Sequence, residues 1–275
     1  MNSEEKIFQK YKTRGSDYHW KEIHRWNLFL FNAYLFARYS IISQAIADIL
    51  QKERMVGRAM QSLIDFGCGD GVQLHTIQLT DIGKSIRLYG IDLSEEAIEV
   101  TKKKIPSANI QIASTYESGF PSNNFDISLS SDVIEHVLDP EKMINEMIRV
   151  TKPGGFILIA TPIRYTEKPI DTMHVQEFFP EEFSRIFRKR KDVVIRKHFL
   201  SHTLKMLLLY NTSIRIFGTQ FPLAKYAVNI LFLLLGWNPF QRRTSYKKIS
   251  APSQLMTYQY VILQKNQHST ENTTK

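Results

Sequence analysis

Three glycines at alternate positions, Gly67, Gly69 and Gly71, follow the apolar run LIDF. Glycine weakens the interior of a strand or helix, so this spacing indicates a local need for positive φ or for close approach of a ligand to the backbone. If the loop leads from a strand into a helix, free N–H groups and the positive end of the helix dipole lie beside it. The loop therefore predicts a nucleotide-like ligand.

Two carboxylates frame this loop. Asp65 precedes the first glycine, where its charge would repel a pyrophosphate and favour a cationic ligand. Asp92 ends the apolar run IRLYGID, where a carboxylate can accept hydrogen bonds from both hydroxyls of a ribose. The dinucleotide pattern G-x-G-x-x-G is not met, because the third glycine comes one residue early. Cys68 is interpreted as a small residue that fills a tight loop.

Short apolar runs alternate with helical patterns between residues 61 and 264. We expect strands at 62–66, 86–92, 109–113, 125–131, 156–162, 192–200 and 257–265, and helices at 72–79, 94–104, 140–150 and 180–187. Ser94 and Asp139 are typical N-caps, and Pro140 fits the first position of a helix. This alternation predicts an α/β fold, with helices on both faces of a parallel sheet and a ligand at the carboxyl ends of its strands.

Five motifs occur in an order that resembles the core of the class I S-adenosylmethionine-dependent methyltransferases. They are LIDFGCGDG, YGIDLSEEAIE, FPSNNFDISLSSDVIEHVLDP, RVTKPGGFILIATP and HVQEFFPEEF. The most similar group includes ubiquinone-precursor O-methyltransferases and methyltransferases that act on sugars, lipids and small metabolites. The resemblance implies a Rossmann-like, seven-stranded, mostly parallel sheet, an antiparallel closing strand at TYQYVILQK, and S-adenosyl-L-methionine as cofactor.

The resemblance also implies a set of cofactor-binding residues. The glycine loop would bind the methionine part, Asp92 the ribose, and Leu93 the adenine. Ser114 stands where the family often has an acidic residue that reads the adenine amine, which is a departure from the pattern. An N-terminal segment often closes the family's site, and Arg14 there could pair with the cofactor carboxylate. The full set is Asp65, Gly67, Cys68, Gly69, Gly71, Asp92, Leu93, Ser114, Thr115, Ser131 and Arg14.

Methyl transfer from a sulfonium requires an aligned nucleophile, exclusion of water, and a base where the acceptor must lose a proton. His174 follows the fifth expected strand after a long loop, and the pKa of imidazole suits proton removal at neutral pH. The alternative is that His174 and Glu177 only orient this loop. Glu135 and His136 are further catalytic candidates, with the alternative that they brace their own loop.

A metal could assist an acceptor hydroxyl by lowering its pKa. Some ubiquinone-type relatives bind a divalent cation with two glutamates and a histidine at the spacing of Asp132, Glu135 and His136. The same Glu-His pair occurs in metal-free relatives, and imidazole is not a preferred ligand of Mg²⁺. We therefore predict that the site has no metal ligands.

An apolar and basic insertion at 201–253 separates the last two expected strands. Its run YAVNILFLLLGWNPF is shorter than the ~20 residues that span a bilayer. It could pack with WNLFLFNAYLF, near the N-terminus, as a cap over the substrate, form a dimer interface, or enter a membrane surface. Its aromatic and basic residues favour headgroup contact across 201–248; they are Trp237, Arg242, Arg243, Lys247 and Lys248.

Charge and composition bound the partners and the location. The net charge of +9 favours anionic partners such as nucleic acid, acidic headgroups or phosphorylated substrates. A single cysteine and a polar N-terminus without a signal sequence predict a cytoplasmic protein, with peripheral contact to the inner face of a membrane as an option. We expect five parts: a helical cap segment (1–55), a cofactor-binding core (56–200), the insertion (201–253), a closing strand (254–265) and a flexible tail (266–275).

The expected activity is methyl transfer to a hydroxyl of a lipid, quinone-like or glycan acceptor. A nucleic-acid (RNA) methyltransferase is the enzymatic alternative, and the apolar insertion argues against it. A cofactor-binding scaffold without catalysis is the other. The sequence leaves the oligomeric state open and allows a dimer.

Overall fold

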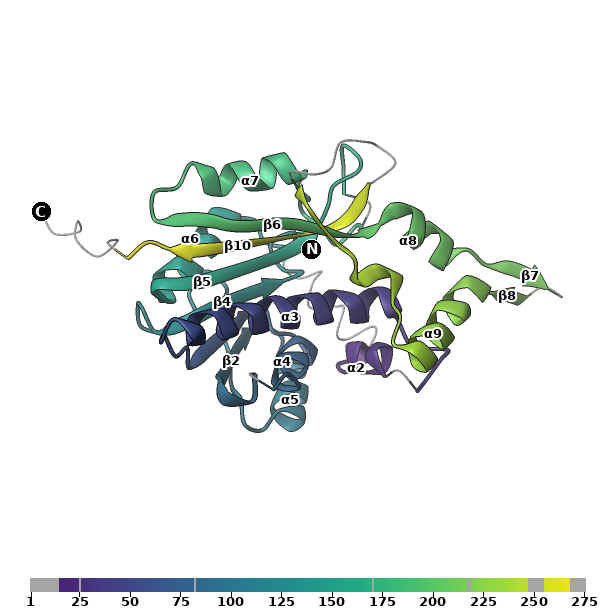
Figure 1. Cartoon of the computed structure of the whole chain (residues 1–275), viewed down its shortest axis with the longest axis horizontal. Helices are drawn as coiled ribbons and strands as arrows, with labels where there is room; N and C mark the ends of the chain where they lie inside the picture. The colour runs from purple at the N-terminus through teal and green to yellow at the C-terminus, as the bar shows by residue number, and fades with distance from the viewer. Residues whose placement is uncertain are drawn as a thin grey trace, which may run out of the picture.

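The computed structural model describes residues 15–24, 26–81, 83–169, 171–216, 219–246 and 255–267. Its main sheet has the order β3-β2-β1-β4-β5-β10-β6-β9 (Figure 1). The strands are β1 (Ser62–Phe66), β2 (Arg87–Asp92), β3 (Asn109–Ile112), β4 (Phe125–Ser131), β5 (Thr151–Pro162), β6 (Val193–Thr203), β9 (Arg243–Ser245) and β10 (Met256–Lys265). The first five strands pair in parallel, and β10 runs antiparallel to both of its neighbours. The Rossmann-like α/β prediction is confirmed.

The strand count is corrected from seven to eight. The additional strand, β9, covers three residues and pairs with the end of β6 at the edge of the sheet. It lies inside the insertion, where the polar triplet RTS is too short to give a periodic signal. The helical α3 (Ala33–Met55) was also not expected as part of the core, yet its buried residues join the cluster below the sheet.

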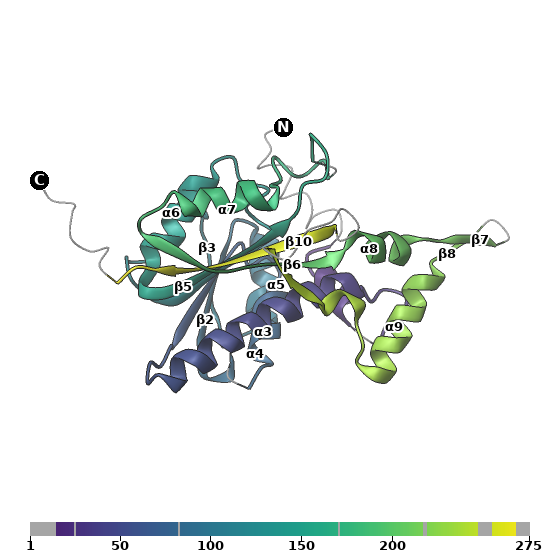
Figure 2. The ribbon, with the colours of Figure 1, turned by 45° about the horizontal axis from the view of Figure 1, so that its top comes forward.

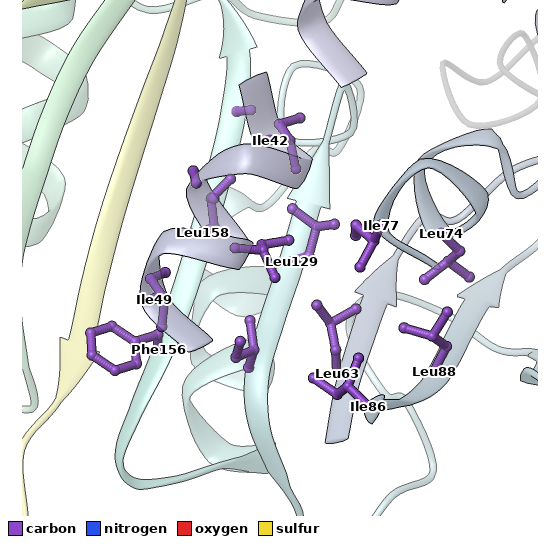
Figure 3. Close-up of a cluster of buried hydrophobic side chains, with 14 of the residues drawn as sticks. Ile42, Ile49, Leu63, Leu74, Ile77, Ile86, Leu88, Leu129, Phe156 and Leu158 are labelled. Atoms are coloured by element: carbon purple, nitrogen blue, oxygen red, sulfur yellow. The ribbon is translucent and has the colours of Figure 1, made fainter. Parts of the chain in front are cut away.

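Helices cover both faces of the sheet. On one face lie α3, α4 (Val72–Gln78) and α5 (Glu95–Lys104), and on the other lie α6 (Pro140–Val150) and α7 (Pro180–Arg188). Alternate strand residues serve the two layers, as Leu63 and Ile64 do in β1. Figure 3 shows Ile42 and Ile49 of α3 beside Leu129 and Leu158 of the sheet. The cores fix the strand ends in place.

Local signals account for the starts of these helices. The Ser94 hydroxyl accepts a hydrogen bond from the N–H of Ala97 at 3.3 Å, and Asp139 Oδ1 accepts one from the N–H of Lys142 at 2.9 Å. Pro140 occupies the first turn of α6. Each cap satisfies a backbone donor that a helix start would otherwise leave without a partner. Helix α6 therefore has the bounds that the sequence predicts.

The segment between β6 and β10 projects from the sheet, and we call residues 204–246 the arm (Figure 2). It contains α8 (Leu204–Asn211), the hairpin of β7 (Ile214–Ile216) and β8 (Thr219–Phe221), α9 (Leu223–Leu235), the 3₁₀ turn Pro239–Gln241, and β9. Phe232 of α9 stacks on Phe31 at a centroid distance of 5.3 Å. Among the described residues, no helix is both long enough and apolar enough to cross a bilayer.

Candidate active site

A cavity of about 440 Å³ opens at the carboxyl ends of β1, β2 and β4, below α2 (Tyr18–Ile23) and the start of α3. Twelve of the residues expected from the sequence line it: Asp65, Gly67, Cys68, Gly69, Asp92, Leu93, Ser114, Thr115, Ser131, Glu135, His136 and His174. Gly71 does not line it, and Arg14, Lys247 and Lys248 lie outside the described residues. The edge of the sheet thus gathers residues from widely separated motifs.

Backbone geometry explains the glycine loop. Gly67, Gly69 and Gly71 have φ angles of +76°, +53° and +84°, which side-chain-bearing residues adopt at a cost. A Cβ on Gly67 would lie 2.4 Å from Cγ2 of Val133, so the loop passes too close for a side chain. A Cβ on Gly71 would instead lie 2.6 Å from Cγ2 of Thr101. Gly71 therefore permits packing of α5 against the loop, whereas Gly67 and Gly69 face the cavity.

Asp92 is held at the end of β2 by two backbone donors. Its Oδ2 accepts from the N–H of Gly69 at 2.9 Å, and its Oδ1 accepts from the N–H of Ser94 at 2.9 Å. Both oxygens keep further lone pairs, because a carboxylate offers about four acceptor positions. The carboxylate therefore links the glycine loop to the next helix and still has acceptor capacity toward the cavity.

Two buried carboxylates give the cavity an unusual electrostatic character. Burial raises the pKa of Asp65 well above its usual value, and the charge of Asp92 raises it further. Burial also raises the pKa of Asp92, although hydrogen bonds from Ser94 and Gly69 act in the opposite direction. A cationic group beside them would stabilise both ionised forms. The donor set therefore fits a ligand that combines positive charge with hydroxyl donors.

Helix α2 closes the cavity over the glycine loop through Asp70. The N–H of His19 donates to Asp70 Oδ2 at 3.2 Å, and Nδ1 of His19 lies 3.1 Å from Asp70 Oδ1. Trp20 Nε1 donates to the carbonyl of Asp70 at 2.7 Å. The sequence predicted an N-terminal segment here but none of these three contacts. An aspartate after a glycine, as at Asp70, does not by itself predict a contact with an N-terminal helix.

His174 and His136 face one another at the far side of the cavity. Their ring centroids are 4.9 Å apart. Nδ1 of His174 donates to Glu177 Oε1 at 2.5 Å, and Nδ1 of His136 donates to the carbonyl of Met173 at 3.0 Å. These bonds leave Nε2 as the basic nitrogen of each neutral ring.

The surroundings of His174 raise its pKa. Burial lowers the pKa, but the hydrogen bond to Glu177 and the charges of Glu135 and Asp171 outweigh burial. Glu135 is fully buried, and its Oε2 accepts from the Thr161 hydroxyl at 2.9 Å. Its Oε1 has no hydrogen-bond partner among the described residues. This carboxylate therefore braces the β5 end and adds negative charge beside His174.

Ligand atoms of Glu135, His136 and His174 lie within 4.8 Å of one another, close enough to share a metal ion. Asp132, the other residue of the metal pattern, pairs with Arg38 instead. The prediction of no metal ligands remains a prediction.

Arg38 is a site residue that sequence reasoning missed. Its guanidinium forms an ion pair with Asp132, donates to Tyr258 Oη at 3.1 Å and lies 4.1 Å from the centre of the Tyr258 ring. Ser131 Oγ is 3.3 Å from the same Tyr258 hydroxyl. The available signal was the single cation in the apolar run AYLFARYSII. These contacts give this side of the cavity a fixed polar wall.

Comparisons with known proteins agree with this geometry. A family model described as "Methyltransferase domain" matches residues 64–159. A probable S-adenosylmethionine-dependent methyltransferase of Mycolicibacterium smegmatis is 27% identical over 158 residues, 56% of this chain and 57% of that protein. A ubiquinone biosynthesis O-methyltransferase of Rhodopseudomonas palustris is 33% identical over 102 residues, 36% of this chain and 39% of that protein. The chain spans about half the length of the curated relatives it matches.

The fold has a counterpart among solved structures. Geranyl diphosphate C-methyltransferase from Streptomyces coelicolor A3(2) superposes with a TM-score of 0.51, covering 81% of this chain and 77% of that chain at 14% identity. That likeness concerns the fold alone, whereas the matched domain covers the glycine loop and the strand that ends at Asp92. Residues 64–159 form a class I S-adenosylmethionine-dependent methyltransferase domain, whose cofactor is S-adenosyl-L-methionine.

Proposed function

We propose that this chain transfers a methyl group from S-adenosyl-L-methionine to a small-molecule acceptor bound in the same cavity. The observation that carries the proposal is the position of Asp92, fixed by Gly69 and Ser94 beside a glycine loop in which Gly67 excludes a side chain. When bound, the cofactor supplies an activated methyl on a sulfonium. The protein must then align the acceptor, exclude water and accept a proton.

Residue roles follow from position and chemistry. Asp92 accepts hydrogen bonds from the ribose hydroxyls, and Asp65 offsets the positive charge of the amino group. Leu93 provides an apolar surface for the adenine. The remaining cofactor contacts in the proposal come from Gly67, Cys68, Gly69, Ser114, Thr115 and Ser131. Gly71 contributes through loop shape, because its α-carbon packs on Thr101.

His174 is the proposed general base. Its Nδ1–H is held by Glu177, so the lone pair of Nε2 takes up the proton that the methylated hydroxyl loses. Glu177 acts as a positioning residue. Glu135 and His136 complete the proposed catalytic group, with Glu135 stabilising the imidazolium that forms.

The acceptor in this proposal is a hydroxyl of a lipid, quinone-like or glycan molecule. The fixed polar wall at Arg38 and Ser131 can orient a polar group, and the neighbouring arm is apolar. Contact of residues 201–248 with a membrane surface belongs to the same proposal, as do the five-part division of the chain and a cytoplasmic location. An RNA acceptor is less well supported, because most of the exposed apolar side chains of the arm are aliphatic and do not stack on bases.

Calorimetric titration with S-adenosyl-L-methionine and with S-adenosyl-L-homocysteine tests the proposal. We expect Asp92→Asn to weaken binding about tenfold or more, because the amide offers one fewer acceptor oxygen to the ribose and keeps no charge. Asp81→Asn is the matched control, since Asp81 is fully exposed and outside the cavity. Absence of binding by the folded wild-type chain would overturn the proposal. Binding without turnover for any acceptor class would instead point to a non-catalytic scaffold.

A further inference from the structure

The arm and the segment before α3 share an exposed apolar surface. We call it the outer face and define it by Phe29, Leu30, Ile230, Leu234, Leu235 and Trp237. Phe29 packs edge-on against Tyr226 of α9 at 5.6 Å, and Asn229 Nδ2 donates to the carbonyl of Leu28 at 2.9 Å. These contacts fix the two segments together. The outer face is therefore one surface built from distant parts of the sequence.

Helix α9 is apolar on both of its sides. Val228 and Phe232 face inward, where they join the cluster that contains Phe31. Positions 223, 227, 230 and 234, spaced as one helical stripe, face outward and are Leu, Ala, Ile and Leu. Leu234 and Leu235 are 72% and 73% exposed. Helices that are apolar all round are normally covered all round, so the outward stripe calls for an apolar partner.

Charge selects the partner. The sequence has no Asp or Glu between residues 193 and 270. Basic side chains occur along the arm at Lys205, Arg215, Lys225 and Arg242. A second copy of the chain would bring the same positive charges to the contact, which disfavours self-association. An anionic bilayer offers negative headgroups for the basic residues and an acyl layer for the leucines.

We infer that the outer face docks on the surface of an anionic lipid bilayer, with α9 lying in the interface plane. Figure 2 shows α9 and the β7–β8 hairpin at the far end from the sheet, where they can reach a surface without disturbing the core. Phe29 and Trp237 add aromatic side chains of the kind that lie at the headgroup level.

The outer face lies near the cavity. Phe31 and Ala33 belong to the apolar cluster that packs on α9. Their neighbours in the sequence, Asn32 and Tyr34, line the cavity. A membrane-bound acceptor would thus approach near the site, and this part of the inference rests on the proposed function. Docking itself rests on the outer face alone, and it can be measured without methyl transfer.

Vesicle sedimentation with the full chain tests the inference. The probes are phosphatidylcholine vesicles with and without phosphatidylglycerol. We expect binding to the phosphatidylglycerol vesicles that weakens as salt is raised. The double variant Leu234→Glu/Leu235→Glu should weaken it about tenfold or more, because it places charge on the apolar stripe. Leu79→Glu, at an exposed leucine distant from the arm, is the matched control and should bind like wild type.

Three outcomes would overturn the inference. The first is that the wild-type chain binds neither kind of vesicle. The second is that the Leu79→Glu control loses as much binding as the double variant. The third is that sedimentation velocity shows a wild-type dimer which the double variant dissociates, while neither protein binds vesicles. The last outcome would assign the outer face to a second copy. Titration with S-adenosyl-L-methionine on every variant separates this test from the proposed function, because cofactor binding should be equal in all of them.

Discussion

Oε1 of Glu177 lies 2.5 Å from Nδ1 of His174, so a buried carboxylate fixes the tautomer of the imidazole that faces the cavity. The same contact, with the charges of Glu135 and Asp171, outweighs burial and holds the pKa of His174 above its ordinary value of 6.5. This geometry orients the base and also raises the pH at which the imidazole loses its proton.

The first prediction concerns the pH dependence of turnover. A base works when neutral, so kcat/KM should rise with pH and reach half its limit above 6.5. Glu177→Gln keeps a hydrogen-bond acceptor but removes the charge, so the midpoint should move down by about one pH unit. Glu181→Gln, on the exposed side of α7, should leave the midpoint in place. A Glu177→Gln profile that only falls in height would assign Glu177 a purely structural role.

The same pair predicts a pH-dependent stability difference. A histidine whose folded pKa is raised contributes stability that is full below its unfolded pKa and is lost as pH rises through the folded value. Glu177→Gln should therefore lower Tm more at pH 5.5 than at pH 8.5, as about 1 kcal/mol of charge-assisted bonding is lost only in the acidic range. Thermal melts at both pH values check this, and an equal or reversed difference would contradict it.

Another prediction concerns Gly67. An alanine there would meet Val133 and would hold φ at +76°. We expect Gly67→Ala to lower the free energy of unfolding by about 3 kcal/mol, from left-handed strain and overpacking. Adding Val133→Ala should recover about half of that loss, measured as a coupling energy in urea unfolding. Gly57→Ala is the control, because φ is +79° there but nothing lies near its Cβ. Additive effects at Gly67 and Val133 would show that the clash is relieved elsewhere.

Cys68 should be unreactive in the folded chain. Burial, followed by the charges of Asp92 and Asp65, raises the pKa of its thiol well above the usual value. The thiolate is the reactive form, so labelling with a disulfide reagent at pH 8 should be about a hundredfold slower in the native protein than in guanidinium. The ratio of the two rates is the measurement. Comparable rates would mean that the loop opens readily.

The contact between Trp20 and Asp70 predicts a kinetic effect on the cofactor. Trp20→Phe removes a 2.7 Å hydrogen bond but keeps an aromatic ring beside His75. One such bond is worth about 1 kcal/mol, so S-adenosyl-L-methionine should dissociate about fivefold faster in stopped-flow experiments. The Trp237→Phe variant, which changes the arm, should release S-adenosyl-L-methionine at the wild-type rate. Identical rates in both variants would show that α2 does not retain the ligand.

Local signals predict much of this fold, as two regions illustrate. Strand β4 and helix α6 have the bounds expected from FDISLSS and from the Asp139-Pro140 start. Strand β5 begins earlier than expected, because Thr151 pairs with Phe125 before a shift in register. The segment KPGG reads locally as a turn, and only the neighbouring strand shows that Thr151, directly before it, is paired.

The candidate site divides in the same way. Asp65 and Asp92 follow apolar strands, so their meeting at one edge follows from the parallel sheet. Arg38 could not be placed, because its role depends on α3 crossing the sheet to reach Tyr258, more than 200 residues away in the chain. Gly67 and Gly71 belong to the same glycine pattern, but Gly67 lies against Val133 and Gly71 against Thr101. The sequence pattern does not show this difference, because it depends on how distant segments pack.

The arm begins directly after Thr203 of β6, and within it β9 pairs with the edge of the sheet. Thr203 and Met256 are paired residues of adjacent antiparallel strands, so the segment between them connects two neighbours in the sheet. The entropy of closing such a loop grows only slowly with its length. The length and surface of the arm can therefore change without altering the strands that carry Asp65 and Asp92. Where the protein works can change by this route while the two carboxylates of the cavity keep their places.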